Sequence, residues 1–175
     1  MLAPDAWVPL AEVARPHGVR GELRLRLFNR DSDLLLHLDE VLVRFPEGDE
    51  QEVSVDAARR ANDAILMKLH SVDDRDRAEE LRGASVCARR GDFPALEDGE
   101  FYACDVEGAR VMIDGGEELG RVTALKTYPT VDVLEVAATD GGRPWEVPLV
   151  DAVIRHIDIQ GGLVTLATRE GIERG

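Results

Sequence analysis

Arginine side chains are concentrated in one short segment near the start of the chain. Between residues 15 and 30 there are five arginines and a single acidic residue, Glu22, so the segment carries a net charge of +4. Guanidinium groups donate hydrogen bonds in a fixed fork that matches phosphate oxygens, and a cluster of this kind suits contacts with a nucleic-acid backbone. The candidate contact residues are His17, Arg20, Arg24 and Arg26.

The spacing of proline and glycine predicts how these side chains are presented. Pro16, Gly18 and Gly21 favour a tight, irregular connection between two strands. Glu22–Phe28 then alternates leucine with charged residues, which is the period of a strand with one buried face. We therefore expect His17 and Arg20 at a loop tip. Arg24 and Arg26 are expected on the exposed face of the strand. The alternative is a glycine-dependent turn whose arginines only solvate the surface, and charge alone leaves the two interpretations about even.

A second unusual feature is the adjacent aromatic pair Phe101-Tyr102, in a chain with only 5% aromatic residues. Neighbouring side chains on an extended chain point to opposite faces, so one ring can be buried while the other is exposed. An exposed aromatic beside a domain junction is a good anchor for a protein partner. The alternative is that both rings fill the first strand of a second domain or pack two domains together, and spacing alone favours it by roughly two to one.

The sequence contains no recognisable catalytic or cofactor-binding motif. It has no G-x-S-x-G, no H-E-x-x-H, no Walker-type phosphate loop and no G-x-G-x-x-G. The four histidines lack metal-ligand spacing, and Cys87 and Cys104 form no C-x-x-C pair. We therefore expect a protein that is not an enzyme and that uses neither a metal nor a cofactor.

Composition and charge narrow the choice of partner and compartment. Apolar residues make up 44% of the 175 residues, enough for a packed core, while a net charge of −14 argues against a general polyanion binder. Residues 1–93 hold 14 basic and 19 acidic residues (−5), and residues 94–175 hold 7 and 16 (−9). The second half therefore suits a basic protein partner better than bare RNA. With two cysteines, no secretory signal and no apolar stretch that could span a bilayer, we expect a cytoplasmic protein.

Short strands separated by turn residues predict an all-β protein. The expected strands lie at Val8–Ala14, Glu22–Phe28, Glu40–Phe45, Glu52–Ala58, Ala64–Leu69, Ala84–Ala88, Glu107–Ile113, Glu118–Lys126, Val131–Ala137, Pro144–Val147 and Leu163–Ala167. One short helix is predicted over Arg75–Arg82, as a lid on a barrel, with Asp73 or Asp74 as its N-cap and Gly83 just after its end.

The segment from Arg89 to Gly99 is rich in turn residues and charged residues and shows no hydrophobic periodicity, which predicts a linker between two domains. We expect a first barrel over residues 1–92, a linker over residues 93–98 and a second barrel over residues 99–175. Two small barrels are the economical arrangement, because closure removes sheet edges that would otherwise template aggregation.

Seven segments, in order and at family-typical spacing, resemble the bacterial ribosome maturation factor family RimM. The first is similar to the family's "G-x-I-x-x-x-H-G-x-x-G-E-hydrophobic" motif, the second to "D-D-R-x-x-A-E-x-L-x-G" and the third to "Y-Y-x-x-D-L-x-G". The resemblance covers nearly the whole chain. The segments are Glu12–Leu25, Asp73–Gly83, Phe101–Gly108, Leu119–Val122, Asp132–Val136, Val147–Val150 and Ile157–Asp158.

The resemblance implies two β-barrels, the first like a translation-factor barrel domain and the second a PRC barrel. It implies a non-catalytic assembly factor that promotes maturation of 16S rRNA. Such a factor associates with the head of the small (30S) ribosomal subunit through the basic ribosomal protein S19. We expect a monomer without a membrane partner.

Motif position and charge then assign contacts on this chain. Phe101, Tyr102 and Asp105 are the expected contacts for S19, whereas the arginine segment is the weaker expectation, for 16S rRNA or the same partner. The family's paired tyrosines are Phe101-Tyr102 here, and Ala103 replaces a tryptophan found in many relatives, for which Trp145 could compensate.

Two other functions remain open. One is a PRC-barrel binding module of a membrane or photosynthetic complex, and the arginine-rich segment argues against it. The other is an rRNA-processing or RNA-modifying enzyme, and the lack of a catalytic constellation argues against that.

Overall fold

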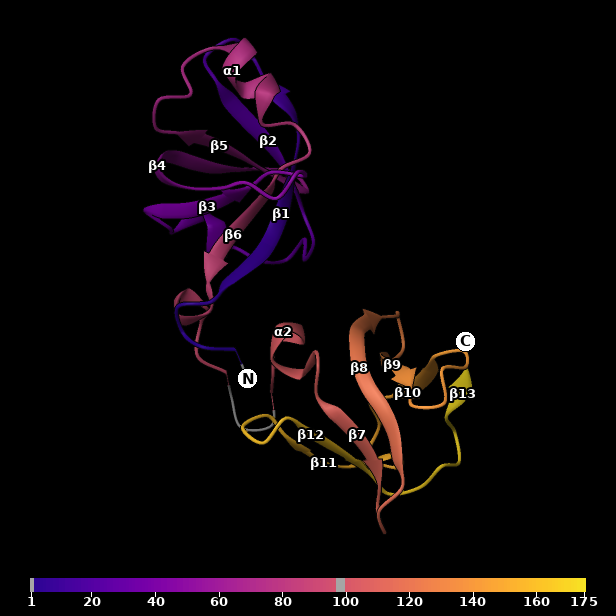
Figure 1. Ribbon diagram of the computed structural model, residues 1–175. Coiled ribbons are helices and arrows are strands. Elements are labelled where there is room, and N and C mark those ends of the chain that lie inside the picture. Colours follow the sequence, from indigo (N-terminus) through magenta and orange to yellow (C-terminus); the bar gives the residue numbers. More distant parts are fainter. Residues whose placement is uncertain (1, 97–99) are drawn as a thin grey trace. The chain divides into compact units, whose positions relative to one another are not determined.

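The computed structural model describes residues 2–96 and 100–175, which form two β-rich units (Figure 1). The first unit runs from Ala3 to Ala95, and the second runs from Leu96 to Gly175 and also includes Leu2. The predicted linker and the start of the predicted second barrel fall partly on residues 97–99, outside the described residues. The exact boundary therefore stays a prediction. Within the described ranges, no helix is long and apolar enough to cross a membrane.

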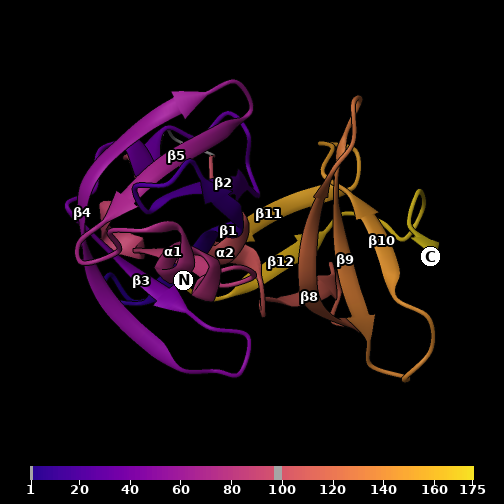
Figure 2. The ribbon, with the colours of Figure 1, turned by 90° about the horizontal axis from the view of Figure 1, so that it is seen from above.

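The first unit is a closed six-stranded barrel with the strand order β1-β2-β5-β4-β3-β6. Closure is made by antiparallel pairing of β1 with β6. In Figure 2, β3, β4 and β5 curve around the barrel. Leu23, Leu25 and Leu27 are buried in its core, as the alternation in the sequence predicted. The strands are β1 (Trp7–His17), β2 (Glu22–Leu27), β3 (Glu40–Arg44), β4 (Glu50–Ala61), β5 (Ala64–Leu69) and β6 (Ser85–Arg89).

The predicted helix is present as α1 (Arg75–Glu80), at one end of the barrel near β1 and β2 (Figure 1). Asp74 is its N-cap, and its carboxylate accepts a hydrogen bond from the Arg77 backbone N–H at 2.8 Å. Ala78 is fully buried in the first core. The helix ends two residues before the predicted Arg82. Two 3-10 turns, η1 (Leu34–Leu36) and η2 (Arg90–Asp92), complete the unit.

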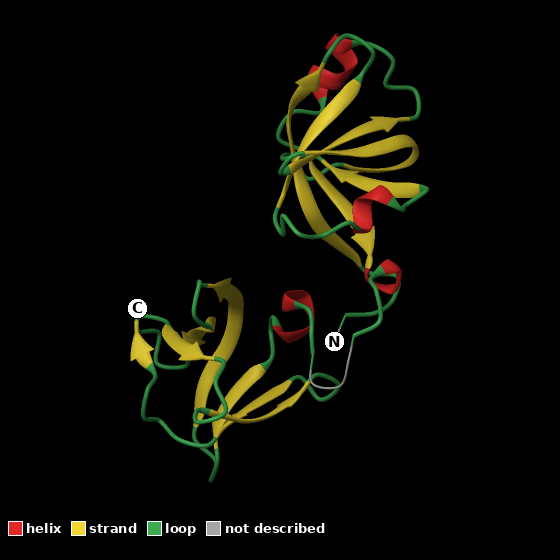
Figure 3. Cartoon of the chain, turned by 180° about the vertical axis from the view of Figure 1, so that it is seen from behind, coloured by secondary structure: helices red, strands yellow, loops and turns green. Residues whose placement is uncertain are grey.

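The second unit is one seven-stranded sheet with the order β11-β12-β7-β8-β9-β10-β13. Its pairs are antiparallel except β12 with β7, which run parallel. The sheet and the short helix before it can be followed in Figure 3. The strands are β7 (Arg110–Ile113), β8 (Glu118–Thr127), β9 (Asp132–Ala138), β10 (Trp145–Pro148), β11 (Ile154–Asp158), β12 (Leu163–Leu166) and β13 (Glu173–Arg174).

The all-β prediction is confirmed, and one expected strand is wrong at its start. The strand predicted from Glu107 begins only at Arg110, because a single helical turn, α2 (Ala103–Val106), comes before it. Gly108 has a φ of +82°, a left-handed conformation that glycine adopts without steric cost, and it turns the chain from α2 into β7. A turn this short has no periodicity that the sequence could reveal. The edge strands β11 and β13 were not predicted either.

Candidate functional site

The predicted aromatic anchors lie directly before α2 in the second unit. Phe101 is half-buried and packs against the second core, while Tyr102 is half-buried at the N-cap position of α2 with an extended backbone. Neither residue belongs to a strand, so the expectation that the pair fills the first strand of the second domain is wrong. The two rings have different surroundings, and only Phe101 is a member of the core.

Asp105, the third predicted contact, is buried. The residue is only 3% exposed. Its backbone N–H donates a hydrogen bond to the Tyr102 carbonyl at 2.9 Å. Among the described residues, every buried side-chain nitrogen or oxygen has a hydrogen-bond partner. A buried carboxylate whose polar atoms have hydrogen-bond partners stabilises the local fold. Asp105 lies in α2, directly after the aromatic pair.

A hollow of about 350 Å³ lies beside the aromatic pair, and we call it the Tyr102 hollow. Most of its walls are apolar or aromatic, and two carboxylates take part in its lining. An apolar recess with acidic groups suits an apolar side chain that comes from a basic protein segment. The lining residues are Leu96, Glu100, Phe101, Tyr102, Leu125, Asp132 and Leu149.

Strand pairing in the second sheet brings these lining residues together. In the β8–β9 hairpin, Leu125 is opposite Leu134 and Thr127 is opposite Asp132. The Leu149 backbone N–H donates to the Asp132 carbonyl at 2.8 Å, which ties the segment after β10 to the start of β9. The hollow therefore combines residues from segments that lie far apart in the chain.

Lys126, the residue after Leu125 in this hairpin, forms an ion pair within the second unit. Its ammonium group contacts the Glu135 carboxylate, and it lies 3.9 Å from the Glu146 carboxylate. The hydrogen bond between Lys126 and Glu135 raises the pKa of the lysine and lowers the pKa of the glutamate. Asp132 forms no ion pair with any described residue, so the hairpin leaves a negative charge at the hollow.

Sequence reasoning predicted the aromatic pair but not the rest of the hollow. Leu96 and Leu125 carried no signal, because single leucines are common in any strand or loop. Asp132 and Leu149 lie in two of the segments that matched family motifs, although the motifs gave them no role. A hollow assembled from distant segments depends on strand register, which a single sequence does not specify.

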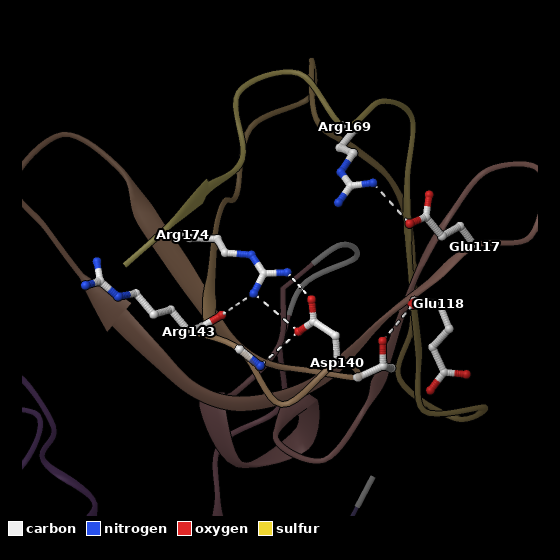
Figure 4. Close-up of polar contacts among 8 residues, drawn as sticks. Glu117, Glu118, Asp140, Arg143, Arg169 and Arg174 are labelled. Atoms are coloured by element: carbon white, nitrogen blue, oxygen red, sulfur yellow. Dashed lines mark hydrogen bonds and ion pairs between the residues drawn. The ribbon is translucent and has the colours of Figure 1, made fainter.

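Trp145, which could compensate for the tryptophan absent at Ala103, is not among the described residues that line the hollow. It packs against the second core, with the guanidinium groups of Arg174 and Arg169 at 4.0 and 5.0 Å from its ring centroid. Figure 4 shows the polar contacts of these arginines, in which Arg174 pairs with Asp140 and Arg169 with Glu117. These contacts hold the C-terminal strand against β10.

In the first unit, Arg20, Arg24 and Arg26 lie where the sequence placed them, but His17 does not lie at the loop tip, because β1 continues through it and pairs it with Glu22. His17 ends β1, Arg20 lies in the exposed loop, and the other two candidates point outward from β2. Gly21 has a φ of +83°, and a Cβ there would lie 2.0 Å from the Val72 carbonyl oxygen, so only glycine fits. The loop is thus docked on the segment that leads into α1.

The outward arginines of β2 form ion pairs within the unit. The guanidinium of Arg26 lies 3.0 Å from the Glu12 carboxylate, and that of Arg24 lies 3.4 Å from the Asp63 carboxylate. Arg59 on β4 reaches in the other direction, to Glu22 on β2, at 3.2 Å. Arg26 therefore pairs toward β1, whereas Arg24 and Arg59 flank Leu66 of β5 from the two neighbouring strands. Their position explains why outward-facing Leu66 on β5 is only 2% exposed.

Comparison with known proteins places both units in one family. The family model "RimM N-terminal domain" matches residues 8–93, and "RimM PRC barrel domain" matches residues 104–172. The chain is 50% identical over 166 residues to the ribosome maturation factor RimM of Sorangium cellulosum, covering 95% of this chain and 97% of the relative. It is 35% identical over 171 residues to that of Corynebacterium glutamicum, covering 98% of each. A crystal structure of RimM from Pseudomonas aeruginosa is 24% identical and covers 92% of this chain and 96% of its own, with a TM-score of 0.48.

Proposed function

The chain belongs to the RimM family of ribosome maturation factors, and from this premise we propose that it is a non-catalytic assembly factor of the small (30S) ribosomal subunit. It associates with the head of the subunit by binding ribosomal protein S19, and in this way it promotes maturation of 16S rRNA. It works in the cytoplasm as a monomer.

The observation that carries the S19 assignment is the chemistry of the Tyr102 hollow. Apolar walls with two carboxylates match a basic protein that inserts an apolar side chain, and residues 94–175 carry a net charge of −9. Acidic surroundings also speed encounter with a basic partner.

Within this site we assign different tasks to the three predicted residues. Tyr102 contacts the partner, since its ring lines the hollow without belonging to the core. Phe101 lines the hollow and also packs on the core, so it holds the wall in place. Asp105 is a buried residue of α2, and we assign it the positioning of this helical turn, whose N-cap position is Tyr102.

The experiment is co-sedimentation of the purified protein in sucrose gradients with free small subunits, with assembled ribosomes and with neither, together with binding to purified S19. We expect selective migration with free small subunits. Tyr102→Ala should weaken both interactions about tenfold or more, because buried aromatic anchors dominate such interfaces. The matched control is Tyr128→Ala, which changes the chain's other tyrosine, exposed and outside the hollow.

Other outcomes would redirect the assignment. Migration that survives Tyr102→Ala would retain the function and transfer the binding site, with the arginine segment as the next candidate. Loss of all association with ribosomal particles at low salt would contradict the assembly role. Cleavage or modification of precursor rRNA by the purified protein alone would establish the enzymatic alternative.

A further inference from the structure

We infer that the outer face of β2, extended by Arg20 at one end and by Phe28 and Arg30 at the other, binds an unpaired stretch of RNA, with Phe28 as a stacking platform for a base. We call this surface the Phe28 face. The inference rests on the proposed function for the choice of RNA as the polymer. It adds a site that is separate from the Tyr102 hollow.

The Phe28 face is a row of alternate residues. Leu23, Leu25 and Leu27 point into the barrel, so the residues between them point outward. The alternation continues past the strand, because the Phe28 backbone N–H donates to the Leu10 carbonyl at 3.0 Å and keeps the chain beside β1. Residues on one face of a strand recur about every 7 Å, so Arg24, Arg26 and Phe28 follow one another at regular spacing after Glu22, whose charge is paired with Arg59.

The charge of this row opposes the charge of its surroundings. The row holds four arginines (Arg20, Arg24, Arg26 and Arg30) and one glutamate (Glu22) and carries +3, whereas residues 3–95 hold 14 basic and 19 acidic residues and carry −5. A local positive row on an acidic unit selects a partner with closely spaced negative charges, as along a phosphate backbone. A basic protein would be repelled here and attracted to the Tyr102 hollow, so the two surfaces have opposite preferences.

The arginines of the row differ in their availability. Arg20 and Arg30 are exposed and form no ion pair with any described residue. The Arg26 side chain is 64% exposed, and its pair with Glu12 is a solvent-exposed one that a phosphate can replace at little cost. Arg24 is only 26% exposed and covers β5, so it is a positioning residue.

Phe28 is the feature of this face that charge does not explain. It is 55% exposed, and the backbone after it is held in place. Arg60 donates to the Arg30 carbonyl at 3.1 Å and to the Ser32 carbonyl at 2.7 Å, and the Ser32 N–H donates to the Asn29 carbonyl at 3.2 Å. An exposed aromatic on an ordered backbone beside arginines is the arrangement that stacks on unpaired bases.

The test is fluorescence anisotropy of the full chain with a labelled, unstructured pyrimidine-rich RNA of about 12 nucleotides, a length within the usual site sizes, and with a duplex of the same length. Phe28→Ala should weaken single-strand binding on the order of tenfold without changing its salt dependence, and Phe28→Trp should restore it. Arg20→Gln with Arg30→Gln should lower the slope of log affinity against log salt by roughly 0.7 for each phosphate that is no longer neutralised.

Two controls separate this inference from the proposed function. Arg77→Gln, on α1, removes an exposed arginine outside the Phe28 face and should leave RNA binding unchanged. Phe28→Ala should also bind purified S19 normally, whereas Tyr102→Ala should lose S19 and retain the RNA. Failure of the wild-type protein to bind the single strand at about 50 mM salt would overturn the Phe28 face, and S19 binding would still stand. Equal affinity of Phe28→Ala and wild type for RNA, or a loss of S19 binding in Phe28→Ala, would overturn it as well.

Discussion

The two units of this chain end their sheets in different ways, and their candidate surfaces differ accordingly. In the first unit β1 pairs with β6 and the sheet closes, whereas in the second the described ladder runs from β11 to β13 without closing. The Phe28 face is the outer side of β2 with the short segments that directly precede and follow it. The Tyr102 hollow is assembled from the segment before α2, the β8–β9 hairpin and the segment after β10. A closed barrel thus offers the faces of its strands, whereas the second unit builds its site between segments.

The largest effect should come from the glycine that docks the arginine loop. Gly21→Ala places a Cβ 2.0 Å from the Val72 carbonyl oxygen and forces a left-handed conformation on alanine. Because backbone must move, we expect the first unit to lose about 3 kcal/mol or more of unfolding free energy. Calorimetry should show a lowered transition, and hydrogen exchange should locate the loss in residues 3–95.

Gly18→Ala is the matched control for this change. Gly18 has a φ of +66° in the same loop, but a Cβ there meets no atom within 4 Å. Only the left-handed conformation is penalised, so the cost should be about 1 kcal/mol. Equal losses for the two variants would show that the close approach to Val72 does not determine the loop.

Substitutions at the aromatic pair of the second unit should affect stability and partner binding to different extents. Phe101→Ala removes a half-buried ring from the edge of the second core, at a cost of about 1–3 kcal/mol of unfolding free energy. Tyr102→Ala should cost less than about 1 kcal/mol, because its ring is not part of that core. Chemical denaturation of both variants, alongside S19 binding, checks this. A stable Phe101→Ala protein that no longer binds would make Phe101 the contact residue.

The same contrast explains how far the sequence could predict the molecule. Alternation in Glu22–Phe28 and the capped helix at Asp74 are local patterns, and the structure has both. The helical turn α2 and the parallel pairing of β12 with β7 have no local pattern, since one is too short for periodicity and the other joins distant segments. Arg24 was predicted as exposed charge, but its pair with Asp63 depends on β5 lying beside β2. Surfaces on one strand were predictable, and surfaces between segments were not.

The charge of the Tyr102 hollow should have a smaller effect than its aromatic wall. Asp132→Asn removes one carboxylate without changing the size of the side chain, so we expect S19 association to slow by a few-fold and to depend less on salt. Stopped-flow or surface-based kinetics at two salt concentrations would measure it. The control is Glu47→Gln in the first unit, exposed and outside the hollow. An equal slowing by both variants would mean that net charge, rather than the hollow, guides the encounter.

The smallest predicted effect concerns β13, the edge strand at one end of the second sheet. The closed barrel of the first unit has no edge strand. The hydrogen bond from Arg174, aided by the Gly142 N–H, holds the pKa of Asp140 below its ordinary value of 3.8. A pKa that is lower in the folded state gives stability that is present above the unfolded-state pKa and is lost as pH falls through the folded-state pKa. We therefore expect β13 to leave β10 on acidification below about pH 4, while the barrel strands stay paired.

Protection of the Gly175 amide, which donates to the Pro144 carbonyl at 3.0 Å, reports on this strand. Asp140→Asn should lower that protection already at neutral pH and flatten its pH dependence, although the effect is modest because the ion pair is exposed. Asp114→Asn removes the partner of Arg155 on β11, at the other end of the ladder, and should leave the Gly175 amide unchanged. If both variants released β13 equally, the strand would depend on the charge of the whole unit, and the ion pair between Arg174 and Asp140 would not be what holds the open edge.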